Sequence, residues 1–561
     1  MSFMHRHSSP DTRHIRLPSA LLRLAAMPAL VLAWGIGTGV THASGSAPTK
    51  PSAPAINRAQ AAPNLKPAAN AAPLSTTPSS TNTFAVTNTG DAPCAQDGSG
   101  GVSRRCAITL ANNSPATYAK VISFAIPSSD PGCALQSINS TGAEVCTIAP
   151  AGDLPPINSS FVTVNGYAQP GAHANTSATA ENATLTIQVD GSSYLNDASG
   201  SGLQMLGNGD LVEGLSLINF HDFSGTGVGI AMSGNGDKAT GDFLGVASRG
   251  IAAGNDHGIS VGPFGATAAD VIGGTIAATR NVISANSFDG AYVASNGNTI
   301  EGNLLGTSPS GTVAMGNGGP NVGLSAASGN TIGGTTTGAR NVISGDAGAG
   351  VSLYLSTGNT IEGNYIGTDV TGAKALGNNL GVYANQSSGN TIGGSSSSAR
   401  NVISGNSSGV YDLSGGNSIA NNYIGMSASK RSLPNTADGV DLATNGATAS
   451  GNLIADSAGA GVAVFSGDAG NVISRNSMYG NGNLGINFQG EAPATCATGV
   501  SSDQANDYFD CPVLSSVTAT TISGTAPAGS TVEVFLAQAD ANDQGHGEGQ
   551  ANLGSTTATS S

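Results

Sequence analysis

The sequence predicts an all-β protein, a solenoid of the parallel β-helix type, and three observations carry that prediction. The segment from residue 272 to residue 425 repeats almost letter for letter every 60 residues, which is the signature of a stacked array. A glycine followed by an apolar-x-apolar run recurs every 22 to 32 residues, as in Gly350-Val351-Ser352-Leu353. Apolar residues do not follow helical spacing, and each of the frequent glycines would cost a helix about 1 kcal/mol relative to alanine.

The 60-residue period contains the same short elements in a fixed order. Ile-Gly-Gly starts at Ile272 and returns 60 and 120 residues later, and Arg-Asn-Val-Ile-Ser starts at Arg280, Arg340 and Arg400. Between them lies Asn-Thr-Ile-Glu-Gly-Asn, which starts at Asn298. Alternation over four to eight residues predicts half-buried strands. Each period therefore contains two rungs of a β-helix.

Eleven glycine-type starts predict eleven rungs. Strands in neighbouring rungs lie about 4.8 Å apart, so the rod would be on the order of 50 Å long. Inward Val, Ile and Leu would stack in columns, while Asn would occupy turns and form amide ladders with the rung below. Longer spacings between rungs predict two columns of stacked loops, a long one (residues 307–317, 368–378 and 426–435) and a short one (275–280, 335–340 and 395–400).

Composition and charge restrict the class of protein. The chain has 81 Gly, only 9% charged residues and 4% aromatic residues, which is unlike a helical protein of this size. The formal net charge of −15 argues against a nucleic-acid partner, because nucleic-acid binding depends on neutralising phosphates with Lys and Arg. The composition fits an extracellular solenoid.

The two ends of the chain differ from the repeats. Residues 1–43 combine four Arg with an apolar stretch at 24–40 and end on Thr41-His42-Ala43, which predicts a signal peptide cleaved after Ala43. An uncleaved membrane anchor is the alternative, and we expect no other transmembrane segment. Residues 44–82 are rich in Pro, Ala, Ser and Thr and predict a disordered linker. The expected location is secreted or on a bacterial cell surface.

Six cysteines flank the array and lie outside it. Pairing of nearest neighbours would close three short loops, joining Cys94 to Cys106, Cys133 to Cys146, and Cys496 to Cys511. Six cysteines allow 15 connectivities, so other pairings stay open. Their spacings do not match a zinc site, and an exported chain favours disulfides.

The N-terminal flank resembles large secreted bacterial β-helix proteins. The resemblance rests on Phe84-Ala85-Val86-Thr87-Asn88, on Cys106-Ala107-Ile108-Thr109-Leu110, on Ile122-Ser123-Phe124-Ala125-Ile126-Pro127 and on Val164-Asn165-Gly166-Tyr167-Ala168-Gln169-Pro170-Gly171. Many such proteins carry a Cys-Ser-Leu-Arg-Glu-Ala motif here, where this chain reads Cys-Ala-Ile-Thr-Leu. The resemblance covers about residues 83 to 550 and implies a right-handed, pectate-lyase-like β-helix without an established activity. We divide this region into an N-terminal cap with the first strands (83–175) and the β-helix repeats (176–490).

The C-terminal flank resembles a different module. Asn506-Asp507-Tyr508-Phe509-Asp510, Thr521-Ile522-Ser523-Gly524-Thr525 and Thr531-Val532-Glu533-Val534-Phe535 look like the first strands of an immunoglobulin-like domain. Only two or three strands fit before Ser561, so we expect residues 491–561 to form a truncated immunoglobulin-like module.

Candidate catalytic residues lie in the early rungs, where the copies diverge. Asp222, Asp256, His257 and Asp289 fall near three successive rung starts and would stack along one edge as a carboxylate patch. Paired carboxylates act as general acid and as base or nucleophile in glycosidases. The alternative is that Asp and His before Gly are ordinary turn residues.

Other polar motifs favour architecture over chemistry. Arg280, Arg340 and Arg400 recur with the period, so we expect them to cap turn carbonyls and to cover apolar surface with their stems. Tyr383 and Tyr411 follow inward valines, so both should point outward, where they would stack on sugar rings or merely reflect strand propensity. No cofactor is expected: Asp369 favours a turn over calcium, and a calcium-like loop starting at Asp540 lacks the acidic twelfth residue.

The leading hypothesis is a secreted or cell-surface β-helix with a structural, adhesive or glycan-binding role. Its partner would be an extracellular polysaccharide or a host surface. The alternative is a polysaccharide lyase or glycoside hydrolase that acts through the early Asp cluster. Only three Lys lie within the array, and this scarcity weakens the enzymatic hypothesis for an anionic substrate.

Overall fold

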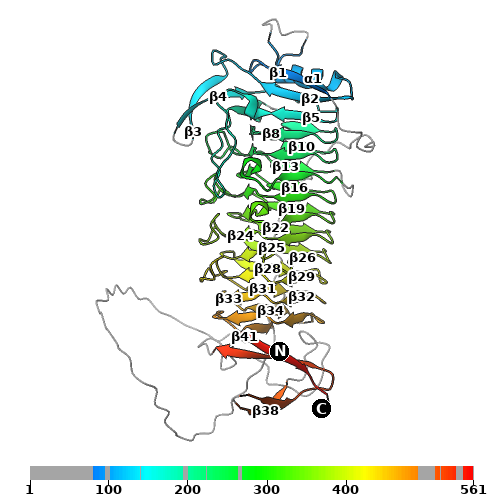
Figure 1. Cartoon of the computed structure of the whole chain (residues 1–561), viewed down its shortest axis with the longest axis vertical. Helices are drawn as coiled ribbons and strands as arrows, with labels where there is room; N and C mark the ends of the chain where they lie inside the picture. Colours follow the sequence, from blue (N-terminus) through cyan, green and yellow to red (C-terminus); the bar gives the residue numbers. More distant parts are fainter. Residues whose placement is uncertain are drawn as a thin grey trace, which may run out of the picture.

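The protein is a long rod of stacked strands, with a helix over one end and antiparallel hairpins at the other (Figure 1). The computed structural model describes residues 80–94, 101–138, 141–193, 200–222, 224–262, 268–465, 467–489, 512–518, 520–538 and 548–559. The predicted signal peptide and most of the predicted linker lie outside these ranges. Nearly all regular structure is β, and the rungs pair in parallel, so the predicted fold class is confirmed.

Three long sheets run along the rod, with 13 strands each in sheets A and B and 11 in sheet C, and most rungs contribute one strand to each. Sheet A contains β1 (Ser80–Val86), β2 (Tyr118–Phe124), β5 (Val162–Asn165), β8 (Leu211–Glu213), β11 (Lys238–Thr240), β14 (Val271–Gly273), β17 (Thr299–Glu301), β20 (Thr331–Gly333), β23 (Thr360–Glu362), β26 (Thr391–Gly393), β29 (Ser418–Ala420), β32 (Thr448–Ser450) and β35 (Val472–Ser474).

Sheet B contains β3 (Cys133–Ile138), β4 (Thr141–Ile148), β6 (Ile187–Asp190), β9 (Ser216–Ile218), β12 (Phe243–Leu244), β15 (Val282–Ile283), β18 (Leu304–Leu305), β21 (Val342–Ile343), β24 (Tyr365–Ile366), β27 (Val402–Ile403), β30 (Tyr423–Ile424), β33 (Leu453–Ala455) and β36 (Ser477–Tyr479). Within it only the β3–β4 pair is antiparallel among the described strands.

Sheet C contains β7 (Leu203–Met205), β10 (Val228–Met232), β13 (His257–Val261), β16 (Ala291–Val293), β19 (Val322–Ser325), β22 (Ala349–Tyr354), β25 (Leu380–Asn385), β28 (Ser408–Asp412), β31 (Val440–Leu442), β34 (Val462–Phe465) and β37 (Ile486–Gln489). Its 11 strands coincide with the eleven rung starts predicted from the glycine signal. The interpretation of the 60-residue period as two rungs is also confirmed, because β14, β20 and β26 alternate with β17, β23 and β29 in sheet A.

The core consists of columns of aliphatic side chains in strict register. Ile300 pairs with Ile332, and Ile332 pairs with Ile361, and all three are 0% exposed. Sheet B has an equivalent column through Ile343, Ile366 and Ile403. Burying an aliphatic side chain of this size stabilises the fold by roughly 1.5–3 kcal/mol, so each rung gains chiefly by covering its neighbours.

Three ladders of buried asparagines mark the corners of the rod. At most steps, the amide of one asparagine donates to the side-chain oxygen of the asparagine in the next rung, as Asn341 Nδ2 does to Asn364 Oδ1 at 3.0 Å. Between Asn317 and Asn378 the chain of hydrogen bonds passes through Asn321. Ladder A precedes sheet A (Asn298, Asn330, Asn359, Asn390, Asn417), ladder B precedes sheet B (Asn281, Asn303, Asn341, Asn364, Asn401, Asn422, Asn452, Asn476), and ladder C precedes sheet C (Asn255, Asn286, Asn317, Asn378, Asn406, Asn435). The predicted amide ladders are confirmed.

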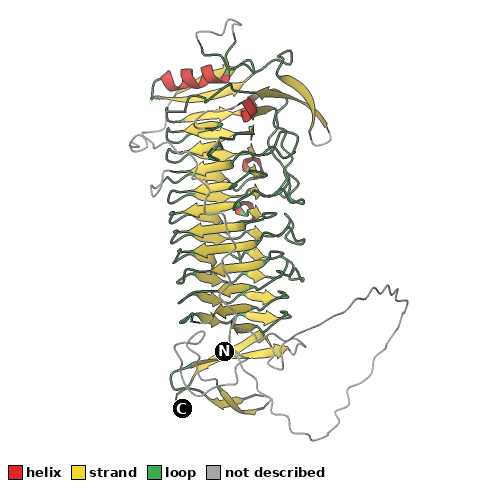
Figure 2. Ribbon diagram, turned by 180° about the vertical axis from the view of Figure 1, so that it is seen from behind, coloured by secondary structure: helices red, strands yellow, loops and turns green. Residues whose placement is uncertain are grey.

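The predicted long loop column is also present, and Figure 2 shows loops stacked along one side of the rod. Antiparallel bridges such as Thr368 to Ala375 close the individual loops. Val370 N donates to Gly311 O and Ala428 N donates to Gly372 O, both at 2.9 Å, which joins each loop to the previous one. The short column contains the 3₁₀ turns η3 (Ala277–Thr279) and η4 (Thr337–Ala339).

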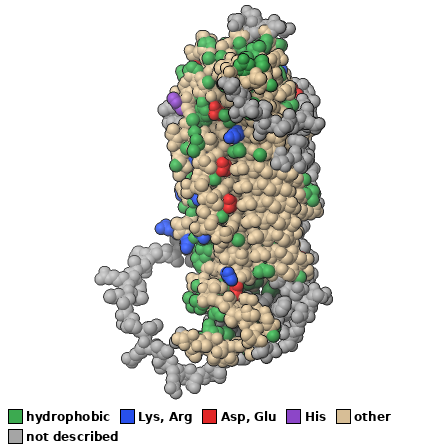
Figure 3. Space-filling model, turned by 45° about the vertical axis from the view of Figure 1, so that its right-hand side comes forward, with side chains coloured by type: hydrophobic (Ala, Val, Ile, Leu, Met, Phe, Trp, Pro, Cys, Tyr) green, Lys and Arg blue, Asp and Glu red, His purple; other side chains and the backbone are tan. Residues whose placement is uncertain are grey.

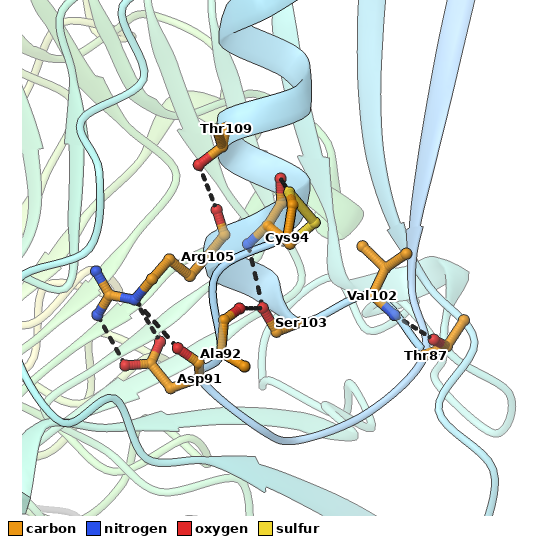
Figure 4. Close-up of a disulfide and its surroundings, with 9 residues drawn as sticks. Thr87, Asp91, Ala92, Cys94, Val102, Ser103, Arg105 and Thr109 are labelled. Carbon is orange, nitrogen blue, oxygen red and sulfur yellow. Dashed lines mark hydrogen bonds and ion pairs between the residues drawn. A yellow bond between two sulfur atoms is a disulfide. The ribbon is translucent and has the colours of Figure 1, made fainter. Parts of the chain in front are cut away.

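The N-terminal end is covered by α1 (Arg104–Asn113), which packs on β1 and β2. Ser103 caps the helix by accepting a hydrogen bond from Cys106 N at 3.1 Å, and a disulfide joins Cys94 to Cys106 (Figure 4). Arg105 forms a two-pronged ion pair with Asp91. The helix and its disulfide shield the open edge of the first rung.

The boundary between linker and cap differs slightly from the prediction. β1 begins at Ser80 and pairs with β2 over its full length, so three residues of the expected linker belong to sheet A. The cap continues directly into the array, because β2 pairs with β5 and β5 pairs with β8. A second disulfide joins Cys133 to Cys146 across β3 and β4, and the proposed partners Cys496 and Cys511 lie outside the described residues.

The C-terminal end carries two antiparallel hairpins, β38 (Val513–Val517) with β39 (Ile522–Thr525), and β40 (Thr531–Gln538) with β41 (Glu548–Thr557). Glu548 accepts from Asn481 Nδ2 at 2.7 Å, and Glu533 accepts from Arg475 N at 2.9 Å. The two glutamate carboxylates thus accept hydrogen bonds from N–H groups that would otherwise donate to a further rung. No helix in the described part of the chain has the length and hydropathy of a membrane span.

Candidate functional site

The early rungs bring one histidine and one aspartate together at the corner before sheet C. Nδ1 of His221 lies 2.7 Å from Oδ1 of Asp256, one rung further along. The other carboxylate oxygen of Asp256 accepts the backbone amides of Asp222 and Gly227, both at 3.0 Å. The Asp256 side chain is only 8% exposed, whereas that of His221 is 49% exposed. A buried, anchored carboxylate therefore orients an accessible imidazole, which is the arrangement of a general base.

The two groups shift each other's pKa. The hydrogen bond from Asp256 is the main cause that raises the pKa of His221. Burial alone would raise the pKa of Asp256, but its hydrogen bonds with His221 and with two backbone amides outweigh burial and lower it. The charged pair is therefore favoured between the lowered pKa of Asp256 and the raised pKa of His221.

We predict that Asp256→Asn lowers the pKa of His221 to near the unperturbed value of about 6.5, because the amide cannot stabilise imidazolium as the carboxylate does. Titration of the imidazole signals by NMR measures this directly. Asp369→Asn is a matched control in a remote loop and should leave the titration unchanged. An unchanged His221 pKa in Asp256→Asn would contradict the pairing.

Asp222 fits the turn interpretation. Its Oδ1 accepts the backbone amides of Ser224 and Thr226, and its Oδ2 accepts from the hydroxyl of Thr226. These bonds hold the loop that carries His221. Asp222 is therefore a positioning residue in this geometry.

His257 and Asp289 form a second, closed pair on the next step of the corner. His257 is 0% exposed, and its Nδ1 lies 3.5 Å from Oδ2 of Asp289. The imidazole packs at 5.4 Å from the ring of Phe288 and at 5.9 Å from that of Tyr292. Three of the four sequence candidates therefore take part in two separate His–Asp contacts: Asp256 with His221, and Asp289 with His257. Among the described residues, no interaction joins the carboxylates of Asp256 and Asp289.

Tyr383 and Tyr411 lie on the outer side of sheet C, as predicted. They are paired in register and their ring centroids are 6.1 Å apart. Each residue is nevertheless only 5% exposed, so the expected open stacking platform for sugars is not observed. The sequence pattern predicted that these side chains point outward, but it did not predict that neighbouring residues bury them.

The recurring arginines bind turn carbonyls, as predicted. Nε of Arg340 donates to Gly363 O at 3.0 Å, and Nε of Arg400 donates to Asn421 O at 2.9 Å. Arg280 uses its whole guanidinium group, which also binds the carbonyls of Ser177, Ala178 and Ala180. Asp369 likewise forms the predicted turn, accepting the amides of Thr371, Ala373 and Lys374.

Buried aspartates replace asparagine in the early rungs, and the sequence analysis missed them. Asp210, Asp237 and Asp270 start ladder A, and Asp242 starts ladder B, each accepting a backbone amide from the previous rung. Burial is the main cause that raises the pKa of Asp237 to about 7 and that of Asp270 to about 8, and it raises those of Asp210 and Asp242 well above the normal range. Alignment of the rungs would have revealed the Asp-for-Asn replacement.

Comparisons with known proteins identify similar β-helices. The family model described as periplasmic copper-binding protein (NosD) matches residues 187–440. No curated protein matches the chain. Among solved structures, the A-module of mannuronan C-5 epimerase AlgE4 from Azotobacter vinelandii is 12% identical, with a TM-score of 0.34 over 68% of this chain and 84% of that one. The AlgE6 A-module from the same organism is 12% identical (TM-score 0.31, 67% and 78%), and the Dettilon tailspike protein gp208 is 15% identical (0.27, 67% and 64%).

The residues at hand do not fit a copper centre. Copper sites use imidazole, thiolate and thioether ligands in a convergent set. In the described ranges all four cysteines are in disulfides, His221 and His257 each face an aspartate, and no group of three His, Cys, Asp or Glu converges on one point. The sequence match and the three parallel sheets nevertheless agree on the architecture: the chain is a parallel β-helix repeat protein whose residues 187–440 are NosD-like.

Proposed function

We propose that the protein is a secreted or cell-surface β-helix with a structural, adhesive or glycan-binding role. One observation carries the proposal: the three sheets continue through the array, and asparagine ladder B continues with them from Asn281 to Asn476. Each rung satisfies the polar groups of its neighbour, so the rod is stiff and presents repeating outer surfaces. Such a surface suits an extended ligand better than a small substrate.

Two further observations support a location outside the cytoplasm. Two disulfides form near the N-terminus, and disulfides persist in oxidising compartments. The matching family is described as periplasmic.

The proposal is tested by incubating the purified chain with a panel of neutral and acidic polysaccharides, while binding and sugar release are measured together. We expect binding to at least one polymer without release of unsaturated or reducing sugar. Sugar release that disappears in Asp256→Ala and Asp289→Ala would overturn the non-enzymatic role.

A second candidate function rests on the His221–Asp256 pair, because a partly exposed imidazole held by a buried carboxylate is suited to proton abstraction. It predicts a polysaccharide lyase or hydrolase in the early rungs. His221→Gln should then abolish sugar release while leaving polysaccharide binding intact. Wild-type protein that binds without turnover would exclude this candidate for the polymers tested.

A further inference from the structure

The outer face of sheet B forms a groove between the two loop columns. Near β18 and β21 it has a volume of about 400 Å³, with Leu304 and Val342 on its floor and Arg280, Arg340 and Val370 among its walls. The strand register continues the same floor along the rod from Val342 to Tyr365, Val402 and Tyr423. The groove therefore leads onto a row of residues that includes two tyrosines two rungs apart.

An arginine side chain stacks on the ring of each of these tyrosines. The guanidinium carbon of Arg340 lies 4.2 Å from the ring centroid of Tyr365, and that of Arg400 lies 4.2 Å from the ring centroid of Tyr423. Lys430 Nζ is 5.7 Å from the same Tyr423 ring. Stacking fixes the plane of each guanidinium group and so directs its remaining N–H donors.

Arg280 shows what the guanidinium groups at these positions can bind. Three carbonyl oxygens of the segment 177–180 accept from its terminal nitrogens, and Glu181 is the acidic group nearby that raises its pKa against the larger effect of burial. At Arg340 and Arg400 only Nε is used for a hydrogen bond among the described residues. Hydrogen bonds to backbone carbonyls thus use every nitrogen of the Arg280 guanidinium group, but only Nε of Arg340 and Arg400.

The chain segment that holds these two arginines is basic on an otherwise acidic chain. Nine Lys and Arg lie between residues 200 and 489, and five of them lie between 340 and 431: Arg340, Lys374, Arg400, Lys430 and Arg431. The acidic residues of that segment are Glu362 and three buried aspartates, Asp346, Asp369 and Asp412. Burial raises the pKa of Asp346 and of Asp412. In Figure 3, Lys and Arg side chains gather along one edge of the rod.

We propose that this basic strip, defined as Arg340, Lys374, Arg400, Lys430 and Arg431, binds a carboxylated polysaccharide of the polyuronate type. Arg340 and Arg400 would each pair with one carboxylate, because a planar guanidinium group matches a carboxylate with two parallel hydrogen bonds. The two arginines are two rungs apart, on the order of 10 Å by strand spacing, so one extended chain running along the rod contacts both. The proposal rests on the glycan-binding part of the proposed function and names its ligand class and site.

The test uses the full chain and measures the Kd for polygalacturonate by calorimetry at low salt. The double variant Arg340→Gln/Arg400→Gln should bind at least about tenfold more weakly, because it loses the charged hydrogen bonds of both guanidinium groups. Lys238→Gln/Arg249→Gln is the matched control, because it removes the same charge from two exposed residues of earlier rungs. The control should change Kd by no more than about twofold, in line with weak and screened surface charges.

A second variant keeps the test decisive if the first is destabilised. Arg340→Lys/Arg400→Lys preserves charge but removes the planar fork, so it should still weaken binding several-fold in a protein that remains folded. Wild-type affinity in this Lys variant would overturn the proposed fork geometry, and equal losses in the Gln and control variants would overturn the site.

Other ligands distinguish the remaining outcomes. Equally tight binding of dextran sulfate, lost in the same variants, would overturn the carboxylate assignment in favour of a general polyanion site. Binding of neutral polysaccharides alone would overturn this inference and leave the glycan-binding role standing. Binding to no polysaccharide would overturn the inference together with the glycan-binding role.

Discussion

Replacing Asn364 with alanine is expected to lower the free energy of unfolding by about 3 kcal/mol. Its side-chain oxygen accepts from the backbone amide and the side chain of Asn341, at 3.2 and 3.0 Å. Its amide donates to the carbonyls of Ile332 and Glu362 and to Asn401. Alanine leaves these buried groups without partners, and each orphaned group costs about 1–3 kcal/mol, partly relieved by relaxation.

Denaturant unfolding and hydrogen exchange of the rungs around β24 would measure this effect. The matched control is Thr335→Ala, an exposed loop residue of the preceding rung, which should change stability by less than about 0.5 kcal/mol. A loss as small as the control's would show that the ladder adds nothing beyond the aliphatic columns.

Replacing Asp237 and Asp270 together with asparagine is expected to stabilise the early rungs at pH 8.5 by about 3 kcal/mol. Both occupy ladder A, where later rungs have asparagine, and the Oδ2 atom of each is buried without a hydrogen bond in the described residues. An asparagine amide places a donor where the carboxylate has only an acceptor. The charged carboxylate is also penalised by burial, which is the main cause that raises both pKa values.

The pH dependence follows from those pKa values of about 7 for Asp237 and about 8 for Asp270, against about 3.9 in the unfolded chain. The folded protein binds more protons between these limits, so wild-type stability is complete below about pH 4 and falls as pH rises through 7 to 8. Asp210, whose pKa is also raised, and Lys120 beside it belong to the same network. They remain in the variant.

Thermal unfolding at pH 5 and pH 8.5 would test this prediction through the difference between variant and wild type, which should grow with pH. Asp369→Asn is the control, because Asp369 already accepts several turn donors and should gain nothing from an amide. A variant that is equally stabilised at both pH values would show that the carboxylates are not protonated in the fold.

Much of the architecture could be predicted because a β-helix rung contacts mainly its two neighbours. The glycine signal predicted all eleven strands of sheet C, and the Ile and Asn repeats predicted the stacked columns. The candidate site was harder. Asp256 and Asp289 were expected to form a carboxylate patch, but each faces a histidine, because the corner turns carry His221 and His257 to the same edge.

The sequence by itself determined the eleven strand starts of sheet C, the two-rung period, the inward and outward faces and the loop columns. These follow from local alternation and from contacts that recur at a nearly constant separation along the chain. Only the tertiary structure decided that Arg280 is enclosed by residues 177–180, that Arg340 and Arg400 rest on tyrosines, and that Tyr383 and Tyr411 are covered. Those contacts depend on how turns of unequal length place side chains around the rod, and hydrophobic periodicity does not encode that placement.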